Sequence, residues 1–142
     1  MKVFVTGGSG FVGGHTIRRL LGDEHTVVAP ARREASCDKL RALGVSSFAI
    51  DYANPVALEQ AMAGCDAVVH IAAYLKMWGP WADFEASNVT LTDQVLTAAK
   101  ACGVRRFVHV SAASVVMQEA IPIIHADESA PLTALRHLPY SA

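Results

Sequence analysis

A cluster of glycines near the N-terminus has the spacing of a phosphate-binding turn. The residues are Thr6, Gly7, Gly8, Ser9, Gly10, Phe11, Val12 and Gly13. Two registers fit, one through Gly8, Gly10 and Gly13 and the other through Gly7, Gly10 and Gly13. Glycine permits a tight turn and lets a pyrophosphate approach the backbone at a helix N-terminus, where free N–H groups favour an anion. Because no Gly-Lys-Ser or Gly-Lys-Thr follows, a P-loop is excluded, and the cluster predicts a dinucleotide site rather than a ligand-free turn.

Two arginines follow the predicted second strand, about 20 residues past the glycines, where NAD-binding folds carry an acidic residue for the ribose hydroxyls. Here the sequence has Arg32 and Arg33. A guanidinium offers a fork of donors that suits a phosphate, so the pair favours NADP over NAD. A solvated pair of arginines is the alternative, and Glu34 beside them keeps NAD open as the cofactor.

The elements that must position these groups alternate along the chain. Short β-branched runs predict strands at residues 2–6, 25–29, 45–50, 67–72 and 106–111. Helical periodicity predicts helices at residues 12–21, 37–43, 56–63 and 84–102, the third capped by Asn54 and Pro55. Residues 74–83 and the segment beyond Ser114 show no clear element. Apolar strands that alternate with helices predict an α/β fold with a doubly wound parallel sheet covered on both faces.

Composition sets the broad class. The chain has 142 residues, 52% hydrophobic and 18% charged, which indicates one packed domain. Its 12 basic and 13 acidic side chains give no footprint for nucleic acid. Apolar stretches such as residues 67–75 are too short to span a bilayer, and no secretion signal precedes the first strand, so we expect a cytoplasmic protein without a membrane partner. Cys37, Cys65 and Cys102 lack the spacing of a zinc site or disulfide framework and are interpreted as small buried hydrophobes, so no metal site is expected.

In this order and spacing, the motifs resemble the extended short-chain dehydrogenase/reductase family, which includes nucleotide-sugar epimerases and dehydratases. Residues 6–13 match its T-G-x-x-G-x-x-G motif, residues 70–73 its H-x-A-A turn, residues 88–92 the start of its long helix, and residues 106–111 its fifth strand. The resemblance implies a Rossmann-type domain over residues 1–142, truncated after the fifth strand and without the family's C-terminal substrate lobe. The cofactor contacts that the resemblance and the motifs predict are Gly7, Gly8, Ser9, Gly10, Phe11, Val12, Gly13, Arg32, Arg33, Asp51, Tyr52, Ile71, Ala72, Ala73, Asn88 and Val110.

The family's chemistry implies a catalytic tyrosine near the C-terminus. Tyr140 resembles the Tyr of the Y-x-x-x-K motif, and the chain stops before the Lys position. In the family the Tyr acts as general acid or base, the Lys lowers its pKa, and a Ser positions the same substrate oxygen. The usual Ser position is Ala112 here, so Ser111 or Ser114 serves after a local shift, or Ser111 satisfies nearby backbone and Ser114 caps a turn.

The resemblance therefore implies an NAD(P)-dependent oxidoreductase, epimerase or dehydratase. It would transfer a hydride at a hydroxyl or carbonyl of a small molecule such as a nucleotide sugar, with this chain as the cofactor-binding part, inactive by itself. The family commonly forms homodimers through its long helix. The alternative is a non-catalytic NADP-sensing or scaffold protein of the same fold, which Ala112 favours.

Several polar and aromatic residues keep two interpretations. His70 either contacts the cofactor through its backbone or is a satisfied core histidine, and Asn88 either lies near the active site or merely starts a helix. Trp78 and Trp81 either form a wall for the substrate or anchor their loop. The basic side chains on the first helix, His15, Arg18 and Arg19, are interpreted as a solvated face.

Overall fold

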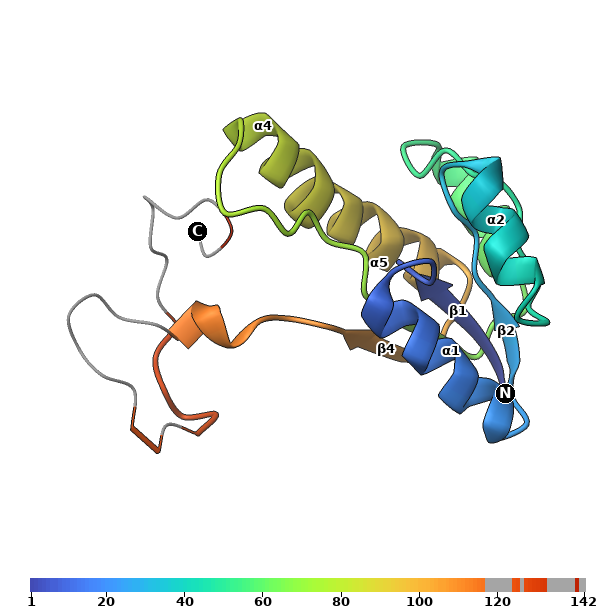
Figure 1. Ribbon diagram of the computed structural model, residues 1–142, viewed down its shortest axis with the longest axis horizontal. Coiled ribbons are helices and arrows are strands. Elements are labelled where there is room, and N and C mark those ends of the chain that lie inside the picture. The colour runs from blue at the N-terminus through green and yellow to red at the C-terminus, as the bar shows by residue number, and fades with distance from the viewer. Residues whose placement is uncertain (117–123, 126, 133–139, 141–142) are drawn as a thin grey trace.

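A four-stranded parallel sheet forms the centre of the computed structural model, which describes residues 1–116, 124–125, 127–132 and 140. The strands are β1 (Lys2–Thr6), β2 (Thr26–Val28), β3 (Ala67–His70) and β4 (Arg106–His109), in the order β2-β1-β3-β4. In the register of the central pair, Val3 lies opposite Ala67 and Thr6 lies opposite His70. The carboxyl ends of β1 and β3 therefore meet at one edge of the sheet (Figure 1).

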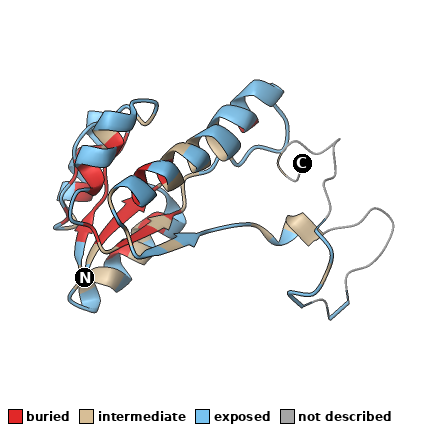
Figure 2. Cartoon of the chain, turned by 180° about the vertical axis from the view of Figure 1, so that it is seen from behind, coloured by how far each residue is buried: buried red, intermediate tan, exposed pale blue. Residues whose placement is uncertain are grey.

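Helices cover both faces of the sheet, which confirms the doubly wound α/β fold. The helices α1 (Phe11–Gly22) and α2 (Glu34–Arg41) pack on one face, and α3 (Pro55–Met62) and α5 (Leu91–Ala101) on the other. Successive residues of a strand point to opposite faces, so Val3 and Val5 join the first core while Phe4 joins the second. Figure 2 shows this buried interior concentrated in the strands and the inner faces of the helices.

The capping signals predicted for α3 are present, and the helix lies one residue earlier than the predicted range 56–63. Asn54 is its N-cap, with the side-chain Oδ1 accepting a hydrogen bond from the Ala57 N–H at 3.2 Å, and Pro55 stands at the first helical position. The helix is followed by Gly64, whose φ of +69° lies in the left-handed region that glycine tolerates.

The strand predicted at residues 45–50 is reduced to isolated parallel bridges, from Val28 to Ser46 and from Ala31 to Ala49. Ala29 donates its N–H to Ser46 O on this outer side, whereas Thr26 donates to Met1 O on the β1 side. Alternation places residue 30 on the β1 side, and Pro30 has no N–H to donate there. Pairing between β1 and β2 therefore ends at Val28, and the outer segment continues beside it only through the bridges.

The predicted helix at residues 84–102 begins three residues earlier and contains a wide turn. Its parts are α4 (Trp81–Phe84), a π-helical segment η1 (Glu85–Thr90) and α5 (Leu91–Ala101). Phe84, Val95 and Ala98 of this helix are buried, and Leu91 is half-buried. A π-turn accommodates one extra residue and frees backbone carbonyls from the usual pattern. The sequence analysis predicted a regular α-helix here, because the helical spacing of apolar residues continues through this segment.

Beyond β4 the chain leaves the sheet as an arm that reaches the short 3₁₀ turn η2 (Ala113–Val116) (Figure 1). Most of the segment predicted to lack regular structure lies outside the described residues. Cys37 and Cys65 are buried as expected, whereas Cys102 is half-buried, and all three are free. Within the described part of the chain, no helix combines the length and apolar character needed to cross a membrane.

Candidate functional site

The glycine loop lies between β1 and α1, at the carboxyl edge of the sheet. Gly10 is the N-cap of α1 and has no side chain to cap the helix, so the first-turn N–H groups of Phe11, Val12 and Gly13 have no side-chain acceptor. Phe11 and Val12 are exposed. A helix N-terminus with free N–H groups attracts an anion through those groups and through the helix dipole.

Steric contacts decide which glycine register the turn requires. Gly7 has a φ of +67°, and a Cβ there would lie 2.8 Å from the backbone N of Ala72. A Cβ on Gly13 would lie 2.1 Å from the carbonyl oxygen of Gly7. Gly8, by contrast, faces the flexible end of Ile17 at 2.8 Å and has no positive φ. The backbone geometry therefore depends on the register through Gly7, Gly10 and Gly13, while Gly8 lets the turn pack on the core.

A cavity of about 390 Å³ opens beside this loop, between α1 and α2. Its wall includes Ser9 and Gly10 from the loop, together with the basic side chains His15, Arg18 and Lys39. No acidic residue of the described chain lines it. The cavity is thus suited by charge to an anionic group next to the glycine turn.

The sequence interpretation of the first helix needs revision for two of its basic residues. Arg19 is on a solvated face, as expected, and pairs with Asp23 at 2.9 Å. His15 and Arg18 are also exposed but line the cavity. The sequence analysis did not identify Lys39 as a cavity residue. Its place in the wall follows only from the packing of α2 beside the glycine turn.

A polar chain connects the loop to β3 and to the long helix. Thr6 Oγ1 accepts hydrogen bonds from the N–H groups of Ile71 (3.0 Å) and Ala72 (3.1 Å), and lies 2.7 Å from His70 Nδ1. With both acceptor positions filled, the Thr6 hydroxyl must donate its one hydrogen to Nδ1. The other ring nitrogen, Nε2, therefore carries hydrogen and donates to Thr92 Oγ1 at 3.0 Å. The buried His70 is a satisfied core histidine in its neutral form.

Burial, and secondarily the nearby charge of His109, lowers the pKa of His70 to about 4. The two rings stack with centroids 5.5 Å apart, and His109 is exposed. Protonation at Nδ1 would place a hydrogen where the ring now accepts one from Thr6. The neutral state is therefore built into the hydrogen-bond pattern as well as into the burial.

Asn88 lies on the π-helical segment and binds the loop that follows β3. Its Oδ1 accepts the Tyr74 N–H at 2.7 Å, and its Nδ2 donates to the Tyr74 carbonyl at 3.3 Å. The backbone carbonyl of Asn88 accepts from Thr92 Oγ1 at 2.7 Å. Asn88 therefore holds the loop through two side-chain hydrogen bonds and is more than a helix-start residue. In that loop Trp78 is 67% exposed and Trp81, at the start of α4, is 50% exposed, so neither is buried as an anchor.

The remaining predicted cofactor contacts fall into two places along the sheet edge. Ile71 and Ala72 pack their backbone against Gly7, followed by the exposed Ala73, and the Val110 N–H binds the carbonyl of His70 at 2.9 Å. These residues surround the carboxyl ends of β1, β3 and β4.

The second place is the end of β2. The hydroxyl of Tyr52 donates to the Pro30 carbonyl at 2.8 Å, and burial raises the pKa of this phenol, opposed by the nearby charge of Arg32. Asp51 is exposed beside it, and Arg32 and Arg33 are exposed without a carboxylate at ion-pair distance among the described residues. The charge of Arg32 thus lies near Tyr52 at the end of β2, and neither arginine has an ion-pair partner among the described residues.

The predicted catalytic residues follow β4. Ser111 is exposed, whereas the Ser114 hydroxyl is buried and has no hydrogen-bond partner in the described structure. Tyr140 is half-buried, and its immediate neighbours lie outside the described residues. An unpaired buried hydroxyl carries an energetic cost, which distinguishes Ser114 from Ser111.

Comparison with known proteins identifies relatives over nearly the whole chain. The model of the NAD dependent epimerase/dehydratase family matches residues 3–142. A 4-hydroxy-2-methyl-3-oxo-4-farnesyl-3,4-dihydroquinoline-1-oxide ketoreductase of Stigmatella aurantiaca is 36% identical over 93% of this chain and 39% of that protein. A 2-alkyl-3-oxoalkanoate reductase of Stenotrophomonas maltophilia is 38% identical over 90% of this chain and 39% of that protein. The chain thus spans well under half the length of these relatives.

Solved structures include proteins of the same architecture. A UDP-glucose-4-epimerase from Stenotrophomonas maltophila, with bound NAD and formylated UDP-arabinopyranose, superimposes with a TM-score of 0.83 at 26% sequence identity. The match covers 99% of this chain and 44% of that one.

Replacing Gly13 by Ala tests the close approach in the glycine turn. The new Cβ would collide with the Gly7 carbonyl, so Gly13→Ala should lower the free energy of unfolding by about 3 kcal/mol or more. The matched control is Gly14→Ala, since a Cβ there meets nothing closer than 3.7 Å. The control should stabilise α1 by up to about 1 kcal/mol. Equal urea midpoints for the two variants would contradict this account of the turn.

The His70 network predicts a pH dependence of stability. The pKa of His70 is about 4 in the folded chain and close to 6.5 when unfolded, so the unfolded chain binds the proton more readily between these values. The stabilisation, at most about 3 kcal/mol, is fully present above pH 6.5 and is lost as the pH falls towards 4. Urea unfolding of the wild type and of His70→Gln, measured from pH 7 to pH 4, should show a steeper fall for the wild type. Parallel curves would refute the assignment.

Proposed function

Because this chain belongs to the NAD dependent epimerase/dehydratase family, we propose that it is the dinucleotide-binding part of an oxidoreductase and that it takes NADP in preference to NAD. The observation that carries the proposal is the glycine turn at the start of α1, where Gly13 approaches the Gly7 carbonyl too closely for any side chain. The pyrophosphate would bind at the free N–H groups of Phe11, Val12 and Gly13. The NAD bound to the epimerase of similar structure supports a nicotinamide cofactor.

The preference for NADP rests on the charges at the end of β2. Arg32 and Arg33 would bind the 2′-phosphate of the adenosine ribose, and Asp51 and Tyr52 would lie beside the adenine. Lys39 and Arg18, in the wall of the adjoining cavity, add to the positive field around the same part of the cofactor. Exposed guanidinium groups without carboxylate partners favour a phosphate over a ribose hydroxyl.

The nicotinamide end of the cofactor would lie along the carboxyl ends of β3 and β4. Ile71, Ala72 and Ala73 would line it from β3, and Val110 from β4. Asn88 would contribute by clamping Tyr74 and so fixing the loop at the edge of the site. The nicotinamide supplies or accepts the hydride when it is bound.

For the proton transfer we assign Tyr140 as general acid or base, as the family resemblance implies. Ser114 is the better candidate for the hydroxyl that holds the substrate oxygen, because its Oγ is buried and lacks a partner in the described structure. Ser111 is exposed, so water can satisfy its hydroxyl. Ser114 would then take the role that Ala112 cannot perform.

The substrate proposed is a small molecule with a carbonyl or hydroxyl group. The relatives of higher identity, at 36% and 38%, are named as reductases of 3-oxo compounds, which favours a 3-oxo compound as the first class to test. A nucleotide sugar, as carried by the epimerase at 26% identity, is the second class. The exposed Leu75, Met77 and Trp78 in the loop after β3, with Trp81 at the start of α4, offer apolar surface that suits the first class.

A cofactor titration tests the proposal. Quenching of tryptophan fluorescence should show tighter binding of NADPH than of NADH. Replacing both Arg32 and Arg33 by Ala should weaken NADPH binding roughly ten- to a hundredfold, because charge-assisted hydrogen bonds to the phosphate are lost, and should leave NADH binding nearly unchanged. Arg19→Ala is the matched control, since this arginine is paired with Asp23 near the far end of α1. The absence of binding by either cofactor would refute the proposal.

The serine assignment is tested by two alanine variants of the gene product that contains this chain. With NADPH and a 2-alkyl-3-oxoalkanoate, Ser114→Ala should lower kcat by roughly a hundredfold, since a positioned donor to the reacting oxygen is removed. Ser111→Ala, the control on the same arm, should leave kcat unchanged. The opposite pattern would assign the role to Ser111.

A further inference from the structure

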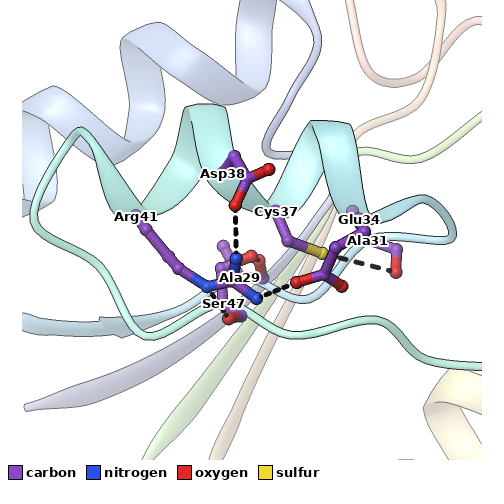
Figure 3. A network of polar contacts seen from close by, with 7 residues as sticks. All are labelled: Ala29, Ala31, Glu34, Cys37, Asp38, Arg41 and Ser47. Atoms are coloured by element: carbon purple, nitrogen blue, oxygen red, sulfur yellow. Dashed lines mark hydrogen bonds and ion pairs between the residues drawn. The ribbon is translucent and has the colours of Figure 1, made fainter.

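Arg41, the last residue of α2, binds both carboxylates of its own helix. Its Nη2 pairs with Glu34 Oε1 at 2.5 Å and its Nη1 with Asp38 Oδ1 at 2.6 Å. Its Nε donates to the carbonyl of Ser47 at 2.9 Å, and the Ser47 hydroxyl donates to the Ala29 carbonyl at 2.7 Å. Figure 3 shows the guanidinium among these groups. Every nitrogen of the guanidinium therefore has an acceptor, and the side chain is anchored to the segment outside β2.

This arrangement sorts the charges of α2 onto two faces. Glu34, Asp38 and Arg41 are spaced three, four and seven residues apart and so share one face, which lies against Ser47. Lys39 lies on the face that lines the cavity beside the glycine turn. The acidic groups of the helix are thus neutralised on the side away from the cavity, and the cation on the cavity side is left uncompensated.

Glu34, which Arg41 binds, lies close in sequence to the residues proposed to bind the cofactor phosphate. Glu34 directly follows Arg32 and Arg33 and opens α2, so its carboxylate belongs to the same end of β2 at which the cofactor phosphate would bind. A free carboxylate there would repel a 2′-phosphate and could instead accept hydrogen bonds from the ribose hydroxyls of NAD. The contact with Arg41 removes it from both roles.

We propose that Arg41 is a positioning residue that sets the preference for NADP over NAD by holding and neutralising Glu34, although Arg41 does not itself contact the cofactor. This inference rests on the proposed function of the glycine turn and of the Arg32–Arg33 pair. The ion pairs of Arg41 are exposed, with 42% of its side chain accessible, so their contribution to folding stability is small. These ion pairs act instead on the electrostatic field at the end of β2.

The test compares dissociation constants for NADPH and NADH in Arg41→Met, which keeps the aliphatic stem and loses the charge. The ratio of the NADH constant to the NADPH constant should fall roughly five- to tenfold relative to wild type, because the released carboxylates would repel a doubly charged phosphate bound at the same end of β2. Adding Glu34→Gln to Arg41→Met should restore most of the ratio. Arg105→Met is the matched control, because Arg105 is likewise exposed and paired, with Asp66 at 2.6 Å, at the opposite end of the sheet, and its ratio should not change.

A second variant keeps the inference testable if Arg41→Met does not fold. Glu34→Gln alone leaves Arg41 bound to Ser47 and Asp38, removes the negative charge at the start of α2, and should raise the ratio two- to fivefold. A purely structural role for Arg41 would weaken both cofactors in parallel and leave every ratio constant, which would overturn the inference while leaving the proposed function intact. A wild type without preference for NADPH would overturn the proposed function, and the role of Arg41 with it.

Discussion

The hydroxyl of Thr6 joins strand ends that are 64 residues apart in the sequence, and the site at the sheet edge depends on this junction. It accepts the N–H groups of Ile71 and Ala72 and donates to His70, so the first residues beyond β3 are fixed against the end of β1. The glycine turn follows Thr6 directly, and the backbone of Ala72 occupies the space that a Gly7 side chain would need. Parallel pairing of β1 with β3 brings these groups together. The positions of the glycine turn, the end of β3 and the N-terminus of α1 are therefore fixed relative to one another.

The same hydrogen-bond chain extends to the irregular part of the long helix. His70 donates to Thr92, and Thr92 donates to the carbonyl of Asn88, which belongs to the π-helical segment. A π-turn leaves carbonyls without their usual partners, and a threonine hydroxyl four residues later supplies one. The Asn88 side chain, on the same segment, binds the backbone of Tyr74. A neutral histidine in the core thus links the end of β1, where the glycine turn begins, to the helix residue that binds the loop after β3.

The net charge of the chain is near zero, but its charged side chains are distributed unevenly. The chain is close to neutral, with 12 basic and 13 acidic side chains, yet the cavity beside the glycine turn is lined by His15, Arg18 and Lys39. The two carboxylates of α2, Glu34 and Asp38, are both bound by Arg41. This local distribution matters more than the net charge, because the electrostatic field at a site is set by charges within about a Debye length. Family membership supports a nicotinamide cofactor, and this charge distribution is the basis of the preference for NADP that we propose.

The sequence by itself determined the alternation of strands and helices, the turn at the start of α1 and the cap at Asn54, because these depend on periodicity and on neighbours within a few residues. It could not choose between the two glycine registers, since the reason for Gly7 is the backbone of Ala72, brought close only by sheet pairing. The weak outer segment at residues 45–50, the π-turn, the partner of Asn88 and the role of Arg41 likewise became evident only in three dimensions. Each depends on a hydrogen bond or close contact between residues that the fold brings together, and local propensity does not encode such contacts.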